Sequence, residues 1–256
     1  MNFQNVPRKD KVVKRAFVPK LDALLFFDYS QIEFVFLGYF CAKLGDSSIV
    51  DALNSGQDLH TESAASALGL PPEEVAADDN LRQVGKTMNY SLIYGGGRPT
   101  ITRQLGVDWF QAGRLLDGFH RRWPGVALVS ARINDTLDTR GYIKTPWGRH
   151  LHPRSRHSAL NTLIQGSAAD LMRSSLVNVH QWLTELELKS HLVLTVHDEL
   201  IIDADFPEIP VLLDGDTSGN TVSRLMDYAP VSEFIQIETD CEWTTTNWAE
   251  KTAYDG

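Results

Sequence analysis

Two acidic segments of this sequence each lie beside an apolar run of strand length. Asp28 ends the apolar run at residues 24–27, and another carboxylate follows at Glu33. Far along the chain, Asp198 and Glu199 lie between the mostly apolar runs 192–196 and 200–202. One carboxylate at a strand end is weak evidence, because many strands run into an acidic turn. Two such sites are what a two-metal centre requires, since each Mg²⁺ takes hard oxygen ligands and keeps positions for substrate phosphates and water.

Between these segments, four large polar residues recur at every fourth position: Arg82, Lys86, Tyr90 and Tyr94. In a helix they fall within an arc of about 120° and span about 18 Å, similar to an extended nucleoside triphosphate. Cations at one end of such a row suit phosphates, and aromatic rings at the other end suit a sugar and a base. The glycines at 95–97 are expected to end this helix.

The 256 residues carry a formal net charge of −9, which argues at first sight against a nucleic-acid partner. The charge is unevenly distributed, however. Residues 81–107 and 139–169 contain four and five basic residues and no acidic one, whereas residues 195–256 contain 14 acidic and two basic residues. A local basic surface can bind phosphates while the rest of the molecule stays acidic. The alternative is that the basic runs are ordinary solvated faces.

The only two cysteines, Cys41 and Cys241, lie far apart in the sequence, so a disulfide framework is not implied and a reducing cytoplasm is expected. No apolar stretch is long enough to span a membrane, and the sequence shows no signal-peptide pattern. A membrane partner is therefore not expected.

The pattern of apolar residues and breakers predicts a mixed α/β chain. We expect a strand at 24–28 and the start of a helix before residue 45, followed by a mainly helical region over 46–160 with breaks at prolines and glycines. A long helix is predicted over about 158–186, a hairpin around 197–199, a helix near 221–228 and a final strand near 234–239.

Together these motifs resemble DNA polymerases of the A family, the bacterial DNA polymerase I family. The segment 28–33 (DYSQIE), the Arg82/Lys86/Tyr90/Tyr94 helix and the segment 197–199 (HDE) are similar to its three polymerase motifs, in order and at similar spacing. Further matches lie at residues 3–8 (FQNVPR), 58–60 (DLH), 123–126 (WPGV), 148–149 (GR), 161–170 (NTLIQGSAAD) and 247–248 (NW). The resemblance covers nearly the whole chain.

The resemblance implies a polymerase palm, an antiparallel sheet with helices, and mainly helical fingers. The palm would comprise residues 1–45, with the metal-binding strand, and 161–256, with the HDE hairpin; the fingers would comprise 46–160. The family places a thumb, and usually an exonuclease domain or its relic, before the palm, and this sequence has no room for either. We therefore expect weak DNA binding by this chain alone. A natural split product completed by a separate chain with the thumb or exonuclease, and a fragment, both remain open.

By the same resemblance, Asp28 and Asp198 are the expected ligands of two Mg²⁺ ions, with the backbone carbonyl of Tyr29 as a further ligand. Glu199 is expected to be a catalytic carboxylate outside the first coordination sphere, or alternatively a surface acid. One metal would lower the pKa of the primer 3′-OH, and the other would steady the triphosphate and the leaving pyrophosphate. The expected location is the cytoplasm of a bacterium or a phage-infected cell.

The resemblance also assigns residues to the incoming dNTP. Lys86 would neutralise the triphosphate and protonate the departing pyrophosphate, and Arg82 would share the neutralisation. Tyr90 would pack on the sugar, and Glu33 would crowd the ribose 2′ position and so reject ribonucleotides. The secondary triphosphate contacts are expected at Gln31 and His60.

Contacts with primer-template DNA are implied for a third group of residues. Tyr94 would lie near the template base and His197 near the primer terminus. Asn161 and Gln165 are one helical turn apart, and their amides suit the minor-groove acceptors common to all base pairs. Arg8 is expected to join them.

The leading hypothesis is thus a template-directed DNA polymerase core that adds dNTPs to a primer 3′ end. Two alternatives from other classes remain: a two-metal nuclease, and a non-catalytic or partner-dependent DNA-binding half of a split polymerase. A nuclease has no use for the 82–94 helix together with Glu33, and the presence of Asp28, Lys86 and Asp198 argues against a decayed, non-catalytic half.

Overall fold

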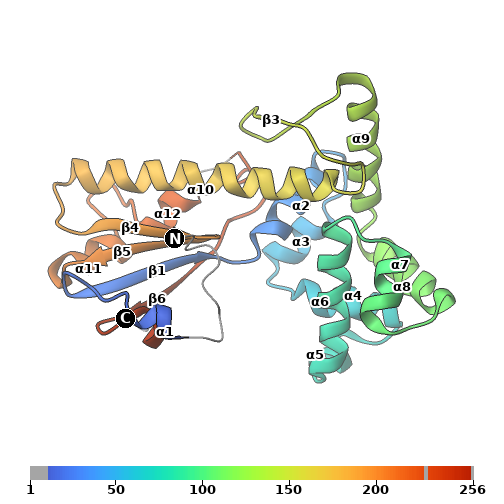
Figure 1. Ribbon diagram of the computed structural model, residues 1–256, viewed down its shortest axis with the longest axis horizontal. Helices are drawn as coiled ribbons and strands as arrows, with labels where there is room; N and C mark the ends of the chain where they lie inside the picture. The colour runs from blue at the N-terminus through green and yellow to red at the C-terminus, as the bar shows by residue number, and fades with distance from the viewer. Residues whose placement is uncertain (1–10, 228–229, 255–256) are drawn as a thin grey trace. The chain divides into compact units, whose positions relative to one another are not determined.

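The computed structural model describes residues 11–227 and 230–254, which form two compact units (Figure 1). The sheet unit comprises residues 1–32, 168–232 and 236–256, and the helical unit comprises residues 33–167 and 233–235. The two divisions fall between residues 32 and 33 and between residues 167 and 168. The predicted domain boundaries lie at 45/46 and 160/161. Within the described ranges, no helix has the length and apolar character needed to cross a membrane.

The sheet unit is built on a five-stranded antiparallel sheet with the order β4-β5-β1-β6-β7, which confirms the predicted α/β fold class. Its strands are β1 (Ala23–Tyr29), β4 (His191–Val196), β5 (Glu199–Ala204), β6 (Thr239–Thr244) and β7 (Thr252–Ala253). Strand β1 is central and buried on nearly every residue. This explains why it reads as an uninterrupted apolar run rather than an alternating one.

The two faces of the sheet are covered by different elements. The second half of α10 (Ala159–Glu185) lies along one face (Figure 1), where the Tyr29 hydroxyl is 2.6 Å from Ser175 Oγ and donates to the Met226 carbonyl at 2.8 Å. On the opposite face, Phe26 stacks on Trp248 with ring centroids 6.3 Å apart. Side chains of successive strand residues point to opposite faces, so Asp28 shares the face of Phe26.

The other elements of the sheet unit are short. They are α1 (Val12–Arg15), η2 (Phe206–Glu208), α11 (Ile209–Asp214), α12 (Val222–Met226) and η3 (Trp248–Glu250).

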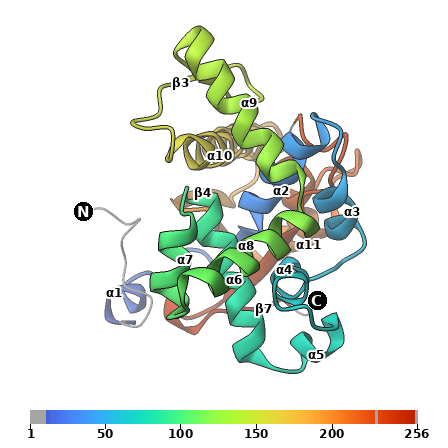
Figure 2. The ribbon, with the colours of Figure 1, turned by 90° about the vertical axis from the view of Figure 1, so that its right-hand side faces the viewer.

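The helical unit consists mainly of helices, with one two-stranded hairpin (Figure 2). Its elements are α2 (Ile32–Ala42), α3 (Ser48–Asn54), α4 (Leu59–Leu68), α5 (Pro72–Ala76), α6 (Asp79–Ile93), α7 (Arg98–Leu105), α8 (Trp109–Arg122), α9 (Gly125–Arg140), β2 (Ile143–Lys144), β3 (His150–Leu151) and the first part of α10. Helix α4 is packed between α6 and α8.

Helix α6 approaches α4 closely because Gly85 lies at their contact. A Cβ atom at this position would lie 1.9 Å from the carbonyl oxygen of His60, so no larger residue fits without moving the backbone. The start of α6 is stabilised by Asp78, whose side chain accepts a hydrogen bond from the Asn80 amide, as is usual for an aspartate at a helix N-terminus. The four-residue spacing thus correctly predicted this helix, which ends at the predicted glycines.

The last predicted strand is displaced in the structure. Residues 234–238 are not in the ladder, and β6 begins at Thr239. Ile235 and Ile237 alternate with polar residues because both are buried, but they are buried outside the sheet. The Ile237 amide donates to Asp227 Oδ1 at 2.8 Å. The long helix, predicted over about 158–186, and the hairpin at 197–199 occur as predicted.

Candidate active site

Pairing of the central strands brings the two acidic segments together in the sheet unit. Asp28 lies directly opposite Glu199 in the β1–β5 ladder, and the Tyr29 amide donates to the carbonyl oxygen of Asp198 at 3.2 Å. Asp198 follows His197, which occupies the left-handed region at φ 57° in the tight turn between β4 and β5. The predicted carboxylate pair is therefore positioned by backbone hydrogen bonds rather than by flexible loops.

The Asp28 carboxyl group lies in a crowded, negatively charged environment. Burial first, and then the neighbouring carboxylates of Asp198 and Glu199, raise its pKa to about 7. Its Oδ1 atom is buried and has no hydrogen-bond partner among residues 11–227 and 230–254. A buried acceptor without a partner costs free energy, and a bound cation would remove that cost.

These residues fit a divalent metal that is shared with a substrate. Two carboxylates and a carbonyl oxygen are hard ligands of the type Mg²⁺ prefers. The Tyr29 side chain is held in the core by its two hydrogen bonds, so its backbone carbonyl is what it can offer to a metal. In the described part of the chain, no group of three or more His, Cys, Asp or Glu side chains could enclose a metal alone. Substrate phosphates and water would complete the coordination.

Two further charged residues at this site, Asp240 and Lys251, were missed by the sequence analysis. Asp240 lies opposite Asp28 in the β1–β6 ladder and accepts a hydrogen bond from Ser30 Oγ at 2.8 Å. Lys251 forms ion pairs with Glu199 and with Glu242. Lys251 is one of only two basic residues after position 194, in a region rich in acidic residues. This feature of the sequence could have identified it as a partner of the carboxylates.

Glu199 is not the surface acid of the alternative hypothesis, since only 7 % of the residue is exposed. The other predicted residues of this unit lie at its surface. Gln31 is exposed in the left-handed region at φ 51°, between β1 and α2, and His197 is exposed at the hairpin turn. Arg8 lies outside the described residues.

In the helical unit, Arg82 and Lys86 of α6 have different surroundings, because Arg82 forms an ion pair with Asp58. The Arg82 guanidinium donates two hydrogen bonds to the Asp58 carboxylate, from Nε to Oδ2 at 2.7 Å and from Nη2 to Oδ1 at 3.0 Å. Asp58 also accepts a hydrogen bond from the Thr61 amide as the N-cap of α4. Burial alone would raise the pKa of Asp58, but hydrogen bonds from Arg82 and Thr61 outweigh it and lower this pKa to about 2. Arg82 thus links α6 to the start of α4, and its predicted triphosphate contact stays a prediction.

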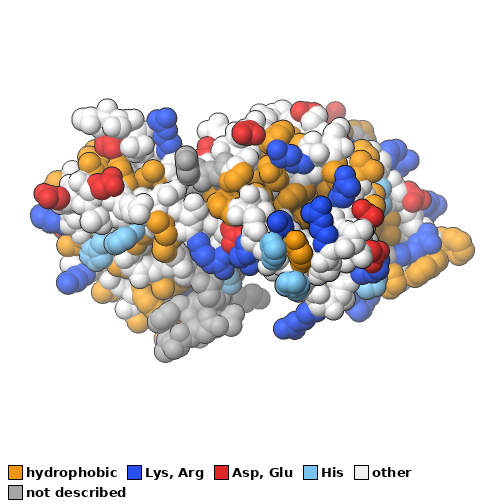
Figure 3. Space-filling view, turned by 90° about the horizontal axis from the view of Figure 1, so that it is seen from above, with side chains coloured by type: hydrophobic (Ala, Val, Ile, Leu, Met, Phe, Trp, Pro, Cys, Tyr) orange, Lys and Arg blue, Asp and Glu red, His pale blue; other side chains and the backbone are white. Residues whose placement is uncertain are grey.

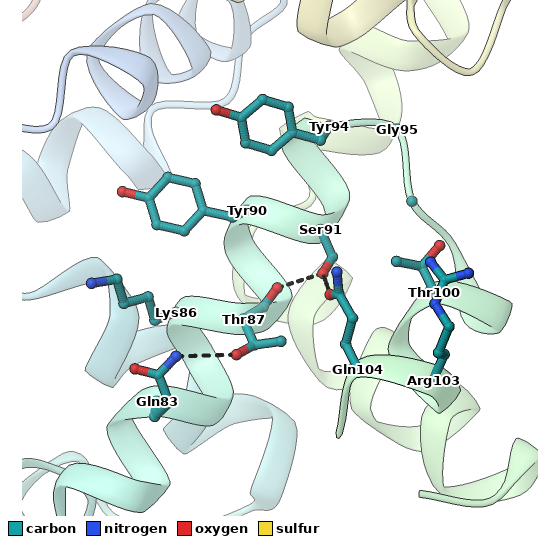
Figure 4. A pocket seen from close by; sticks show the side chains of 11 residues that line it. Gln83, Lys86, Thr87, Tyr90, Ser91, Tyr94, Gly95, Thr100, Arg103 and Gln104 are labelled. Atoms are coloured by element: carbon teal, nitrogen blue, oxygen red, sulfur yellow. Dashed lines mark hydrogen bonds between the residues drawn. The ribbon is translucent and has the colours of Figure 1, made fainter. Parts of the chain in front are cut away.

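Lys86 differs from Arg82, because its ammonium makes no hydrogen bond or ion pair with any described residue. It lines an open pocket of about 770 Å³ together with Tyr90, Tyr94 and Arg103 (Figure 4). Among the other lining residues, the buried Ser91 hydroxyl lies within hydrogen-bond distance of two acceptors, the Gln104 side chain of α7 and the Thr87 carbonyl. The pocket thus brings together the Lys86 cation and the two aromatic rings, for which contacts with a triphosphate, a sugar and a template base are predicted.

Tyr90 belongs to an aromatic cluster with Phe34, His60 and Tyr94, at centroid distances of 6.3, 5.7 and 6.3 Å. His60 is buried, and burial lowers its pKa to about 4, with the neighbouring charges acting as smaller effects. Its Nδ1 lies 3.0 Å from Asn89 Nδ2. The structure therefore places a neutral His60 beneath Tyr90, where it supports the ring; its predicted triphosphate contact stays a prediction.

Three other predicted residues form a network in the same unit. The Tyr94 hydroxyl donates to Glu33 Oε1 at 2.8 Å, and Gln165 Nε2 donates to that hydroxyl at 3.3 Å. Asn161 lies one turn before Gln165 on α10, and its buried Oδ1 has no partner among the described residues. Glu33, Tyr94 and Gln165, which are predicted to face the sugar, the template base and the minor groove, are thus joined by hydrogen bonds.

The basic run at 139–169 is exposed. Its five basic side chains all lie at the surface: Arg140, Lys144, Arg149, Arg154 and Arg156. Arg156 forms an ion pair with Asp138, so part of this charge is neutralised locally. On the face shown in Figure 3, Lys and Arg side chains lie among His and hydrophobic side chains rather than in an unbroken patch.

Comparison with known proteins identifies the family of the chain. The sequence model of DNA polymerase family A matches residues 1–250. DNA polymerase I of Pseudomonas aeruginosa is 34 % identical over 218 residues, which are 79 % of this chain and 23 % of that protein. DNA polymerase I of Chloroflexus aurantiacus is 34 % identical over 226 residues, or 81 % of this chain and 23 % of its own length.

A solved structure with a similar fold is the POL domain of Pol1 from M. smegmatis in complex with DNA primer-template and dNTP. It superposes with a TM-score of 0.83 at 28 % identity, covering 96 % of this chain and 44 % of that one. The chain spans about a quarter of the length of the curated relatives. With a family model matched over almost its whole length, this chain belongs to DNA polymerase family A.

Proposed function

We propose that this chain carries the nucleotidyl-transfer centre of a template-directed DNA polymerase, which adds dNTPs to a primer 3′ end with two Mg²⁺ ions. One observation carries the proposal. In the β1–β5 pairing, Asp28 lies opposite Glu199, the next residue Tyr29 donates its amide to the Asp198 carbonyl, and a buried Asp28 oxygen is left without a partner in the described chain. Such a pair is arranged to share cations with a substrate.

Asp28, Asp198 and the Tyr29 carbonyl would hold the two metal ions. When bound, the ions lower the pKa of the primer 3′-OH and neutralise charge on the triphosphate and the leaving pyrophosphate. The residues themselves supply rigid positioning, because strands β1 and β5 are almost completely buried. A small displacement of a positioning group can greatly slow such a reaction.

The helical unit would bind the incoming nucleotide. Lys86 is the α6 cation available to the triphosphate, and its ammonium would donate a proton to the departing pyrophosphate. Tyr90 would pack on the sugar, and Glu33, held by Tyr94, would exclude a ribose 2′-OH. Arg82, which also fixes α6 against α4 through Asp58, would share the neutralisation of the triphosphate.

DNA contacts are proposed for Asn161, Gln165, His197 and Arg8. The half-buried Asn161 amide and the exposed Gln165 amide suit minor-groove acceptors, and the exposed His197 imidazole suits a primer terminus. The M. smegmatis relative was solved with primer-template and dNTP, which supports the same ligands here. A second chain that supplies a thumb remains part of the proposal.

The test is primer extension with Mg²⁺ and radiolabelled dNTPs, by the chain alone and mixed with a thumb domain from a relative. Asp28→Ala and Asp198→Ala should each abolish turnover while preserving the far-UV circular dichroism spectrum. Asp214→Ala is the matched control, because Asp214 is an exposed aspartate at the end of α11. Wild-type rates in either active-site variant would show that the metal ligands are wrongly assigned.

A second assay separates this proposal from a nuclease. The chain is incubated with Mg²⁺ and a mismatched primer in the absence of dNTPs. We expect no shortening of the primer. Steady shortening that Asp28→Ala abolishes would support a two-metal nuclease instead.

A further inference from the structure

We propose that Lys251 is a positioning residue of the metal site, which holds the Glu199 carboxylate away from the ions bound by Asp28 and Asp198. Its ammonium contacts both Glu199 and Glu242, and would thereby reserve metal coordination for the two aspartates. This inference rests on the proposed function, because it concerns the same carboxylates.

The sheet places all of these groups on one face. Residues directly opposite each other in an antiparallel ladder point to the same side, and Asp28 lies opposite both Glu199 and Asp240. Phe26, two residues earlier on β1, lies opposite Glu242. This one face therefore carries four carboxylates, and Lys251 lies over it with Nζ 4.8 Å from the Phe26 ring centroid.

The residues that precede and follow Lys251 in the sequence are both fixed to the sheet. Before it, Trp248 of η3 is almost fully buried and stacks on Phe26. After it, Thr252 pairs with Trp243 in the β6–β7 ladder. The Lys251 side chain is only 21 % exposed, so a normally flexible ammonium is restricted to the position between Glu199 and Glu242.

Without this cation, Glu199 would become a competing ligand. It follows Asp198 directly and lies opposite Asp28 in the ladder, so its carboxylate projects from the same face of the sheet as that of Asp28. A third carboxylate would increase the negative charge at the site and bind a free cation more tightly. It would also occupy positions that the substrate phosphates require. We therefore infer that Lys251 lowers the affinity for the free cation but keeps coordination positions open for the substrate phosphates.

The alternative is an ordinary ion pair that only stabilises β7. The two explanations differ in their dependence on Glu199, because a stabilising role would act equally through Glu242. A metal-binding measurement on the DNA-free and dNTP-free protein separates them and does not require polymerase activity.

The experiment measures Mn²⁺ binding by isothermal titration calorimetry in wild type, Lys251→Met and Lys251→Arg. We expect Lys251→Met to bind Mn²⁺ about five- to tenfold more tightly, since the released Glu199 carboxylate can then join Asp28 and Asp198 as a further oxygen ligand. We also expect its primer-extension kcat to fall at least about tenfold with little change in KM for dNTP. Lys251→Arg should restore both values to within about threefold, because a guanidinium can hold the same carboxylates.

Two further variants make the result specific. In a Glu199→Gln background, Lys251→Met should no longer change Mn²⁺ affinity. Lys189→Met is the matched control, since Lys189 forms its ion pair with Asp205 instead of a carboxylate of this cluster. If Lys251→Met does not fold, Lys251→Gln removes the charge while keeping a hydrogen-bond donor.

Unchanged Mn²⁺ affinity in the folded, neutral variant, or the same change in the Glu199→Gln background, would overturn the inference. Failure of the proposed function has a different signature, in which Asp28→Ala leaves Mn²⁺ binding intact in the wild-type background.

Discussion

The phenol of Tyr94 donates a 2.8 Å hydrogen bond to the carboxylate of Glu33, although the two residues lie on different helices, at the end of α6 and in the first turn of α2. Burial and then this hydrogen bond raise the pKa of Tyr94 to about 12, so the phenol remains a donor at every working pH. The residue proposed to exclude a ribose 2′-OH is therefore oriented by the residue proposed to face the template base.

Tyr94→Phe should weaken sugar discrimination. Loss of one partly exposed hydrogen bond to a charged group costs about 1 kcal/mol, so we expect the preference for dNTP over rNTP to fall about fivefold. The measurement is the ratio of kcat/KM for dNTP and rNTP. Glu33→Ala should lower the ratio further, and adding Tyr94→Phe to Glu33→Ala should change it little. Equal, independent effects of the two substitutions would show that the hydrogen bond does not orient Glu33.

Tyr90 should control the use of dideoxynucleotides. A tyrosine hydroxyl can fill the space and the hydrogen-bonding role left by a missing 3′-OH, whereas phenylalanine leaves that gap unsatisfied. An unmet polar group in a closed pocket costs roughly 1–3 kcal/mol, or about one to two decades in selectivity. Tyr90→Phe should therefore depress the kcat/KM for ddNTP relative to dNTP. An unchanged ratio would place Tyr90 away from the sugar.

Asp28 should destabilise the metal-free protein. Because its pKa is raised to about 7, the folded state binds more protons than the unfolded state between about pH 4 and pH 7, and stability falls as the pH rises through this range. In EDTA at pH 7.5, Asp28→Asn should stabilise the fold by about 1–3 kcal/mol and raise Tm by several degrees.

Mg²⁺ provides the control for that prediction. Millimolar Mg²⁺ should raise the Tm of wild type, since a ligand of the native state stabilises it, and should leave Asp28→Asn nearly unchanged. Differential scanning calorimetry measures both. A lower Tm for Asp28→Asn in EDTA would mean that the Asp28 carboxylate makes net favourable contacts.

His60 should make the protein sensitive to acid. Its pKa is lowered to about 4 in the fold against 6.5 in the unfolded chain, so the unfolded state binds the extra proton between these values. Stability from this residue is fully present above pH 6.5 and is lost as the pH falls towards 4, by up to about 3 kcal/mol. Urea denaturation at pH 7 and pH 4.5 measures this loss. His60→Gln should reduce the difference between the two pH values, and an unchanged difference would contradict the assignment.

The sequence by itself was sufficient for the elements that carry the candidate site. An apolar run ending in Asp28 predicted β1, the four-residue period from Arg82 predicted α6, and the segment around Asp198 predicted the β4–β5 hairpin. These predictions succeeded because strand and helix periods are local properties of a few neighbouring residues. The order of the motifs also indicated the family that the comparisons established.

Only the tertiary structure decided which partner each charged side chain has. Arg82, for which a triphosphate contact is predicted, forms an ion pair with Asp58, while Glu199 is paired with Lys251. Both pairings join segments far apart in the chain, and each depends on the register of strands or the close approach of helices. Residue periodicity does not encode those relationships, because it specifies which face of an element is buried but not which element covers that face.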